Sequence, residues 1–167
     1  MFQSIKQKRV SCIVFAIYFM LLAWLILFKF STSLSALPNM RSINFIPFYY
    51  GQETSAHLKE VLYNVIVFIP LGVYVQIFKE DWNTIKKCLV AFLTSFLFEV
   101  IQFIFAIGAS DITDIIGNTL GGIVGIHFCT MMKKIAPNEC ISIINVFGIL
   151  IEITAVALLV LLLAANG

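Results

Sequence analysis

The segment EVIQFIFAIGASDITDIIGNTLGGIVG, residues 99–125, decides how this chain folds, because it is apolar enough for lipid yet rich in acids and amides. It contains no basic residue, and its acidic and amide side chains are Glu99, Gln102, Asp111, Asp114 and Asn118. A carboxylate at the middle of a bilayer costs about 2.5–3.5 kcal/mol on insertion scales, so such acids face a bundle interior or a water-filled cavity. The segment therefore predicts two membrane helices whose polar faces meet.

The rest of the chain has the composition of a membrane protein. Of its 167 residues, 60% are hydrophobic and 12% are charged, and the mean hydropathy is +0.99. Soluble domains carry about 25% charged residues. The net charge of +2 is small, and no basic patch alternates with aromatic residues, so nucleic-acid binding is not expected. These values predict one polytopic membrane domain that covers residues 1–167.

Five stretches are long and apolar enough to cross a hydrocarbon core about 30 Å thick, which needs roughly 20 residues of helix. They are residues 11–28, 61–78, 88–107, 114–132 and 141–164. The first stretch follows basic residues, but its apolar run exceeds the 7–15 residues of a signal-peptide core, so it is expected to remain as a helix. The fold class is therefore all-α, a bundle of about five transmembrane helices, in which Pro70 is expected to kink the second helix.

The distribution of Lys and Arg predicts the orientation, since cytoplasmic loops carry the excess of these residues. With the N-terminus in the cytoplasm, the cytoplasmic residues are Lys6, Lys8, Arg9, Lys79, Lys86, Lys87, Lys133 and Lys134. The external residues are Lys29, Arg41 and Lys59. We therefore expect a multi-pass protein of the plasma membrane. In this topology His57 and His127 lie on opposite sides, so no metal site or cofactor is expected.

One face of the fourth helix combines the polar residues with glycines. At 100° per residue, its members fall within about 80° of each other. They are Asp111, Asp114, Asn118, Gly121 and Gly125. With Gly117, the glycines form a doubled GxxxG pattern, which lets another helix approach closely. That helix could belong to this chain or to a second copy in a homo-oligomer, and Gly72 of the second helix is also expected to pack closely.

Counting depths along two antiparallel helices predicts which polar residues meet. If "GAS", residues 108–110, forms a short external turn, Glu99 and Asn118 both lie roughly 12 Å below the external end. Gln102 and Asp114 share a shallower level, and Asn64 of the second helix could join them. The sequence thus predicts an outward-facing polar recess that these residues line as a candidate ligand-binding site.

Four further features leave alternatives open. Asp111 lies at the membrane boundary, where it could line the recess or cap the N-terminus of the fourth helix. Glu152 lies near the middle of the fifth helix and is either protonated or faces a partner chain. His127 points away from the acidic face and is interpreted as a residue of the cytoplasmic end. The external segment 29–60 contains INFIPFYY, which is either an interfacial anchor or a cap over the bundle.

Two sequence blocks, NVIVFIPLG (residues 64–72) and FEVIQFIFAIGASDITDIIGNTLGGIVGI (residues 98–126), resemble the signature blocks of the VanZ family. NFIPF, residues 44–48, resembles a third and shorter block, and the similarity runs from residue 27 to residue 126. The matching positions are Asn64, Pro70, Gly72, Glu99, Gln102, Asp111, Asp114, Asn118, Gly121 and Gly125. The resemblance implies a small membrane protein of Gram-positive bacteria linked to low-level resistance to teicoplanin and other lipid-bearing glycopeptide antibiotics.

The chain departs from this family at one point. Many members carry an Arg ahead of the acidic run and two adjacent acids, whereas the segment here reads GASDITD. A counter-charge for the acids would have to come from Arg41, Lys59 or a bound cation.

Three functional hypotheses follow. The leading one is non-catalytic binding, in the recess, of a membrane lipid, a lipoglycopeptide antibiotic or a lipid-linked cell-wall precursor. The second is an enzyme acting on a polyprenyl-phosphate lipid, with Mg²⁺ on Asp111 and Asp114 and Glu99 as the base, although no Ser–His pair, Cys–His pair or phosphate-cradling loop is found. The third is a transporter or proton pathway, for which the expected internal repeat is not evident.

Overall fold

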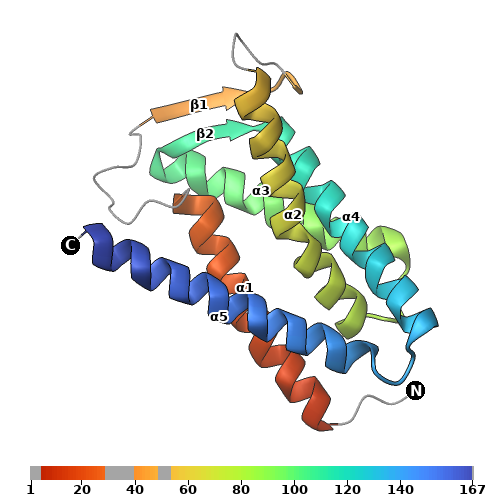
Figure 1. Cartoon of the computed structure of the whole chain (residues 1–167). Helices are drawn as coiled ribbons and strands as arrows, with labels where there is room; N and C mark the ends of the chain where they lie inside the picture. The colour runs from red at the N-terminus through yellow and green to blue at the C-terminus, as the bar shows by residue number, and fades with distance from the viewer. Residues whose placement is uncertain (1–4, 29–39, 49–53, 167) are drawn as a thin grey trace.

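The computed structural model describes residues 5–28, 40–48 and 54–166 and contains five long helices and two short strands (Figure 1). The helices are α1 (Ile5–Phe28), α2 (Thr54–Phe78), α3 (Thr84–Phe105), α4 (Ile112–Ile135) and α5 (Cys140–Asn166). The strands are β1 (Met40–Asn44) and β2 (Ile107–Asp111). All five helices are long and apolar enough to cross a membrane, which confirms the predicted helical membrane fold.

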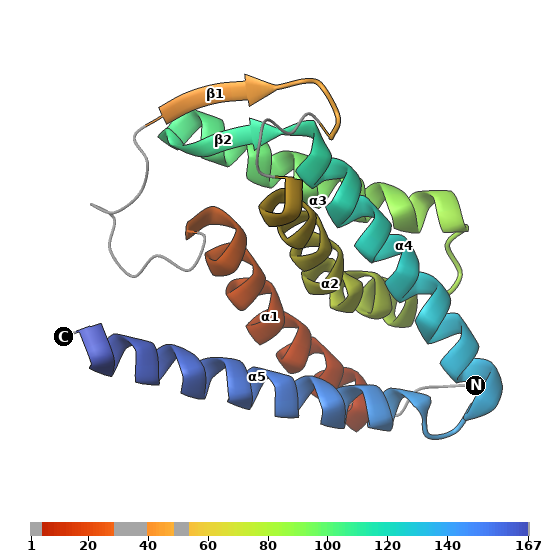
Figure 2. The same ribbon diagram turned by 45° about the horizontal axis from the view of Figure 1, so that its top comes forward.

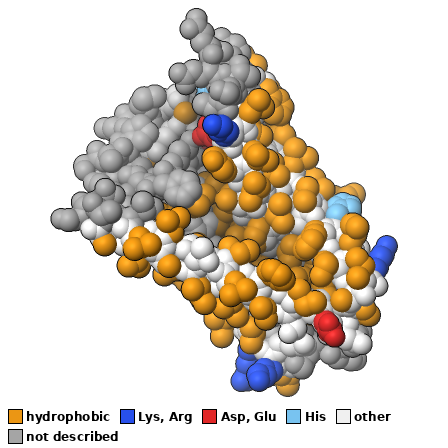
Figure 3. All heavy atoms as spheres, in the orientation of Figure 1, with side chains coloured by type: hydrophobic (Ala, Val, Ile, Leu, Met, Phe, Trp, Pro, Cys, Tyr) orange, Lys and Arg blue, Asp and Glu red, His pale blue; other side chains and the backbone are white. Residues whose placement is uncertain are grey.

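The helices run back and forth between two ends of the molecule. The start of α1, the α2–α3 connection and the α4–α5 connection lie at one end, and the strands lie at the other (Figure 1). Helix α2 packs along α4, and α5 crosses α1 on the outside of the bundle (Figure 2). Apolar side chains cover the middle of the face drawn in Figure 3, while most of the charged side chains lie near its ends. This distribution suits a protein surrounded by lipid.

Glycines set the distance between α2 and α4. A Cβ atom added at Gly121 or Gly125 would meet the backbone carbonyl of Val65 or Ile69 on α2. On α2, a Cβ at Gly72 would meet the carbonyl of Gly122. The two backbones can approach this closely only because these positions lack side chains. The glycine face of α4 is therefore occupied by α2 of the same chain.

Pro70 lies inside α2, and a side chain from α1 completes the backbone hydrogen bonding next to it. The Tyr18 hydroxyl donates to the Val67 carbonyl at 2.7 Å and accepts from the Leu71 amide at 3.2 Å. In a regular helix those two backbone groups would bond to each other. Around this point Phe68 and Leu71 are almost fully buried in the apolar core between α1, α2 and α3.

The two strands form a parallel ribbon that the sequence analysis did not predict. Met40 pairs with Ile107, and the register continues to Asn44 and Asp111. Residues 108–110, expected to be a tight turn, instead lie within β2. Helix α3 ends at Ala106, whose left-handed φ of 54° reverses the chain, so β2 runs back beside the last turns of α3. Parallel strands need a long crossover, which α2 and α3 supply.

The ribbon also determines the place of the segment that was expected to be an anchor or a cap. Its described part, residues 40–48, pairs with β2 and then contacts α4, where the Phe48 amide donates to Thr113 Oγ1 at 3.1 Å. This part therefore lies against β2 and the start of α4, and the anchor and cap alternatives both remain predictions. Lys29, Tyr49 and Tyr50 lie outside the described residues.

At the opposite end, an ion pair joins two connections. Lys133 in the last turn of α4 lies 2.9 Å from the Glu80 carboxylate, which follows α2. Both Lys133 and Lys134 lie at the negative end of the α4 dipole, where cations are favourable. The cytoplasmic location of this end remains a prediction from the distribution of basic residues.

Candidate functional site

Most of the polar residues of the opening segment are buried between helices. Asn118, which is 1% exposed, donates to Ser95 Oγ on α3 at 2.8 Å. Asn64 of α2 donates to the Asp114 carboxylate on α4 at 2.7 Å. Gln102 is also 1% exposed, and its amide donates to the Ile26 carbonyl of α1 at 2.9 Å. These residues join neighbouring helices, so the open recess expected around Asn118 is wrong for this structure.

The residues that were expected to meet at equal depth, Glu99 with Asn118 and Gln102 with Asp114, have other partners in the structure. Asn118 meets Ser95, one turn nearer the start of α3 than Glu99, and Gln102 meets α1 rather than Asp114. The reason is the path of β2, which returns along α3 and brings Asp111 beside Glu99. A short turn at residues 108–110 would start α4 level with the end of α3. Because β2 first runs back along α3, α4 begins about one helical turn deeper in the bundle.

Glu99 holds this returning segment in place. Its side chain is buried with 4% exposure, and Oε2 accepts the Asp111 backbone amide at 3.0 Å. The Ser110 hydroxyl donates to the Glu99 backbone carbonyl at 2.9 Å. Glu99 thus anchors the junction between β2 and α4.

Asp111 links the ribbon to α4. Its Oδ1 accepts the Thr113 amide at 2.7 Å, so it caps the N-terminus of the helix. Its Oδ2 accepts from Asn44 Nδ2 of β1 at 3.1 Å. Asn44 Oδ1 in turn accepts the Ile46 amide at 3.1 Å. Both acids at this junction therefore accept hydrogen bonds from groups that the ribbon positions.

A pocket of about 410 Å³ lies against this junction, between α3, the ribbon and the start of α4. We call it the ribbon pocket. Its lining residues are Ile43, Asn44, Phe45, Phe92, Phe96, Glu99, Val100, Phe103, Ser110, Asp111, Ile112 and Ile115. Its volume falls within the range of about 300–1,000 Å³ that is typical of small-molecule sites.

Two of the six predicted ligand-binding residues, Glu99 and Asp111, line the ribbon pocket. The other four, Gln102, Asp114, Asn118 and Asn64, are absent from its lining. Asn44 and the aromatic wall were not predicted from the sequence. Phe92, Phe96, Glu99 and Phe103 follow the i, i+4, i+7, i+11 spacing of one helix face. This spacing indicates a pocket wall only together with the path of β2.

The aromatic wall lies on the outside of the bundle. Phe92, Phe96 and Phe103 are 40%, 49% and 38% exposed, so the pocket is bounded by side chains that also face lipid. An apolar chain could lie against this wall along α3. Glu99, Asp111 and Asn44 also belong to the lining, but almost all of the surface that the pocket exposes is apolar. Such a site suits the apolar part of an amphiphile.

Of the basic residues considered as counter-charges, neither Arg41 nor Lys59 belongs to the lining of the ribbon pocket. Arg41 of β1 donates from Nη2 to the Ile104 carbonyl at 3.2 Å, near the end of α3. Lys59 is exposed on α2. Within the described ranges, no group of three or more His, Cys, Asp or Glu side chains is arranged to hold a metal ion.

Comparisons with known proteins place the chain among relatives. A family model described as VanZ/LLP1 matches residues 15–133. The chain is similar to "Protein VanZ" of Enterococcus faecium, with 36% identity over 139 residues, which covers 81% of this chain and 84% of that protein. No solved structure matches the chain. The family model includes the ribbon pocket and the glycine contacts, and it ends before α5.

Proposed function

The chain belongs to the VanZ family, and from this premise we propose that it confers low-level resistance to teicoplanin and other lipid-bearing glycopeptides. We place it in the plasma membrane and assign it a non-catalytic role, the binding of an amphiphile in the ribbon pocket. The amphiphile is the antibiotic itself or a lipid-linked cell-wall precursor, and binding lowers the amount of antibiotic that acts at the membrane surface.

The observation that carries this proposal is the presence of one buried acid, Glu99, and one half-buried acid, Asp111, in the lining of an otherwise apolar pocket. Glu99 and Asp111 line the pocket beside Asn44, and phenylalanines of α3 form its wall. Carboxylates accept hydrogen bonds from ammonium and amide groups, and these bonds strengthen where water is excluded. The phenylalanine wall provides apolar contact area for an acyl or prenyl chain.

The chemistry of the lining also selects among ligands. Acids repel a phosphate or another carboxylate unless a cation lies between them. A ligand with an amine or several amide N–H groups needs no such ion. The ribbon pocket is therefore better suited to the cationic or amide-rich part of a molecule than to a bare phosphate.

Neutralising Glu99 tests this proposal. The variant Glu99→Gln keeps the size of the side chain but removes its charge, so we expect teicoplanin susceptibility to rise toward that of cells with an empty vector. Asp114→Asn is the matched control, because Asp114 lies in the same polar cluster but outside the pocket lining. Quantitative immunoblots of membranes would establish that all variants are present at equal levels.

A second variant separates binding from folding. Val100→Trp adds bulk to the pocket wall without changing either acid, and it should reduce resistance if an amphiphile occupies this space. Full resistance of both Glu99→Gln and Val100→Trp at normal membrane levels would remove the pocket from the mechanism. Turnover of a lipid intermediate by the purified protein would contradict the non-catalytic part of the proposal.

A further inference from the structure

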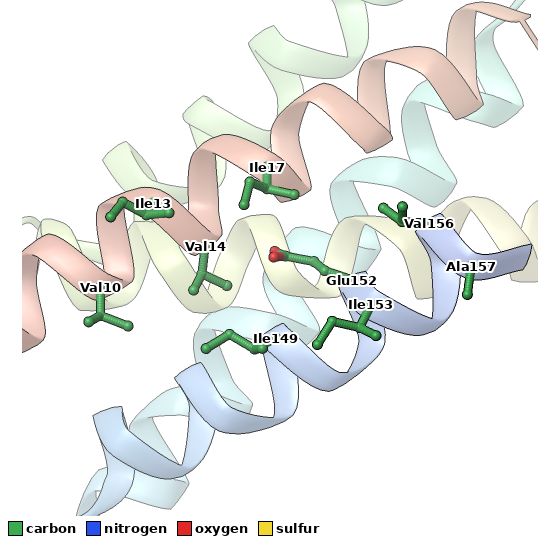
Figure 4. Close-up of a pocket in the computed structure, with 9 residues that line it drawn as sticks. All are labelled: Val10, Ile13, Val14, Ile17, Ile149, Glu152, Ile153, Val156 and Ala157. Atoms are coloured by element: carbon green, nitrogen blue, oxygen red, sulfur yellow. The ribbon is translucent and has the colours of Figure 1, made fainter. Parts of the chain in front are cut away.

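A second pocket lies between α1 and α5, far from the ribbon along the sequence (Figure 4). We call it the α1–α5 pocket, and its volume is about 640 Å³. Its lining residues are Val10, Ile13, Val14, Ile17, Ile149, Glu152, Ile153, Val156 and Ala157. Glu152 is the one polar side chain in this lining. The size again suits a small molecule, and the apolar walls suit an alkyl chain.

The Glu152 carboxyl group points from α5 toward α1, into the space between the two helices (Figure 4). The residue is only 8% exposed, and its Oε1 atom is buried with no hydrogen-bond partner in the described chain. The backbone of Tyr18 and the Tyr74 side chain are the polar groups near this carboxyl. A buried carboxyl with an unpaired oxygen is rare and needs an explanation.

The neighbouring polar contacts between these helices are already satisfied. One to two turns from Glu152, Asn145 Nδ2 donates to Ser11 Oγ at 3.0 Å, and Tyr74 donates to Asn145 Oδ1 at 3.4 Å. The packing of α5 on α1 therefore has its own hydrogen-bonded contact. Glu152 is not needed for that contact, and its buried Oε1 has no hydrogen-bond partner among the described residues.

The pocket is separate from the site proposed for resistance. The family model matches residues 15–133, so Ile17 is the one lining residue inside the matched segment. The pocket is thus formed by the start of α1 and by α5, which lies beyond the matched block. A function of this pocket would be additional to the property that the family shares.

We propose that the α1–α5 pocket binds a lipophilic primary amine, with its alkyl chain between the helices and its ammonium group on Glu152. An ammonium group donates hydrogen bonds and neutralises the carboxylate, which removes the penalty of an unpaired charge in apolar surroundings. A fatty alcohol cannot neutralise the charge, and a fatty acid would add a second negative charge. Binding is non-covalent, and the amine is released unchanged.

Dodecylamine provides the test. Equilibrium binding of radiolabelled dodecylamine to the full chain in phosphatidylcholine nanodiscs should exceed binding to empty nanodiscs. Glu152→Gln should weaken this binding about tenfold or more, because a charge-assisted hydrogen bond is lost. Glu139→Gln, an exposed acid before α5, is the matched control and should bind like the unaltered protein. Ala157→Phe, which fills the pocket, should reduce binding as well.

Several results would overturn the proposal. Equal dodecylamine binding by the unaltered protein and by Glu152→Gln would remove the carboxylate from the site. Dodecanol binding as tight as dodecylamine would show that the pocket recognises only the chain. A cross-link between two copies of Ile153→Cys in membranes would assign this face to a second copy. Each result is independent of antibiotic resistance, so the ribbon-pocket proposal is tested separately.

Discussion

At the scale of single residues, the Tyr18 hydroxyl acts as part of the backbone of another helix. It donates to the Val67 carbonyl and accepts from the Leu71 amide, on either side of Pro70. A hydroxyl can do both at once, because it carries one donor and two acceptor sites. In a bilayer, an unsatisfied backbone group costs several kcal/mol. Tyr18 therefore allows α2 to bend at its proline without leaving these groups unpaired.

We predict that Tyr18→Phe destabilises the fold by about 1–2 kcal/mol, the usual effect of removing one partner of a buried hydrogen bond. The measurement is equilibrium unfolding in nanodiscs or bicelles by steric trapping. Tyr63→Phe is the control, because Tyr63 is 60% exposed on the same helix. Equal stability of the two variants would mean that α2 closes the Val67–Leu71 hydrogen bond directly and does not need the hydroxyl.

The same scale shows how much of the site the sequence could predict. Glu99 and Asp111 were identified because an acid in an apolar segment needs a physical reason, and both line the ribbon pocket. Phe92, Phe96 and Phe103 were missed because phenylalanine is equally suited to lipid, so composition alone does not distinguish a pocket wall. Their spacing with Glu99 becomes informative only when the path of β2 is known.

At the scale of elements, helices and strands differed in how well they could be predicted. Each helix follows from an apolar run of sufficient length, and all five were predicted, although α1 and α2 begin six and seven residues earlier than expected. The strands are five residues each and contain the small or polar sequences MRSIN and IGASD. Their pairing joins residues far apart in sequence, and no local pattern encodes such a contact. Because the ribbon was not predicted, the expected contacts between α3 and α4 were also wrong by about one helical turn.

The glycines of α4 give a prediction at this scale. Gly121→Ala should destabilise the α2–α4 contact by about 1–3 kcal/mol, the usual effect of overpacking, because the new Cβ would meet the Val65 backbone and lie 2.9 Å from the Phe68 Cβ. Gly117→Ala is the matched control from the same motif. Its Cβ would lie 3.5 Å from the nearest atoms, which is an ordinary contact.

Stability of the two alanine variants can be compared by retention of the folded monomer during heating in detergent. Comparable stability of Gly117→Ala and Gly121→Ala would contradict the proposed role of Gly121, because the closer approach to α2 at Gly121 would then have no effect of its own. A gain for Gly117→Ala would be consistent with the better helix propensity of alanine.

At the scale of the whole molecule, the positions of the connections predict which end faces the cytoplasm. The start of α1 and the α2–α3 and α4–α5 connections, with the Lys residues in or next to them, lie at one end, and the ribbon lies at the other (Figure 1). Lys and Arg are retained on the cytoplasmic side during insertion. The ribbon pocket is therefore expected in the outer half of the membrane, where a glycopeptide arrives.

Cysteine labelling of intact cells tests this orientation. In a background without the native cysteines, Ile46→Cys beside the ribbon should react with a membrane-impermeant maleimide. Asn138→Cys, in the exposed α4–α5 connection, should react only after the cells are opened. The opposite pattern would place the ribbon in the cytoplasm and would contradict binding of an external antibiotic in the ribbon pocket.

The parallel ribbon also imposes an order on the synthesis of the protein. Because β1 pairs with β2, residues 40–44 must wait until residue 107 and those after it have been made and α3 has been inserted. At about 5–20 residues per second, the interval lasts several seconds. During this time β1 is an unpaired strand edge, which other chains can bind. A ribosome that stalls before residue 107 would therefore leave a nascent chain with an open edge, a natural substrate for membrane quality control.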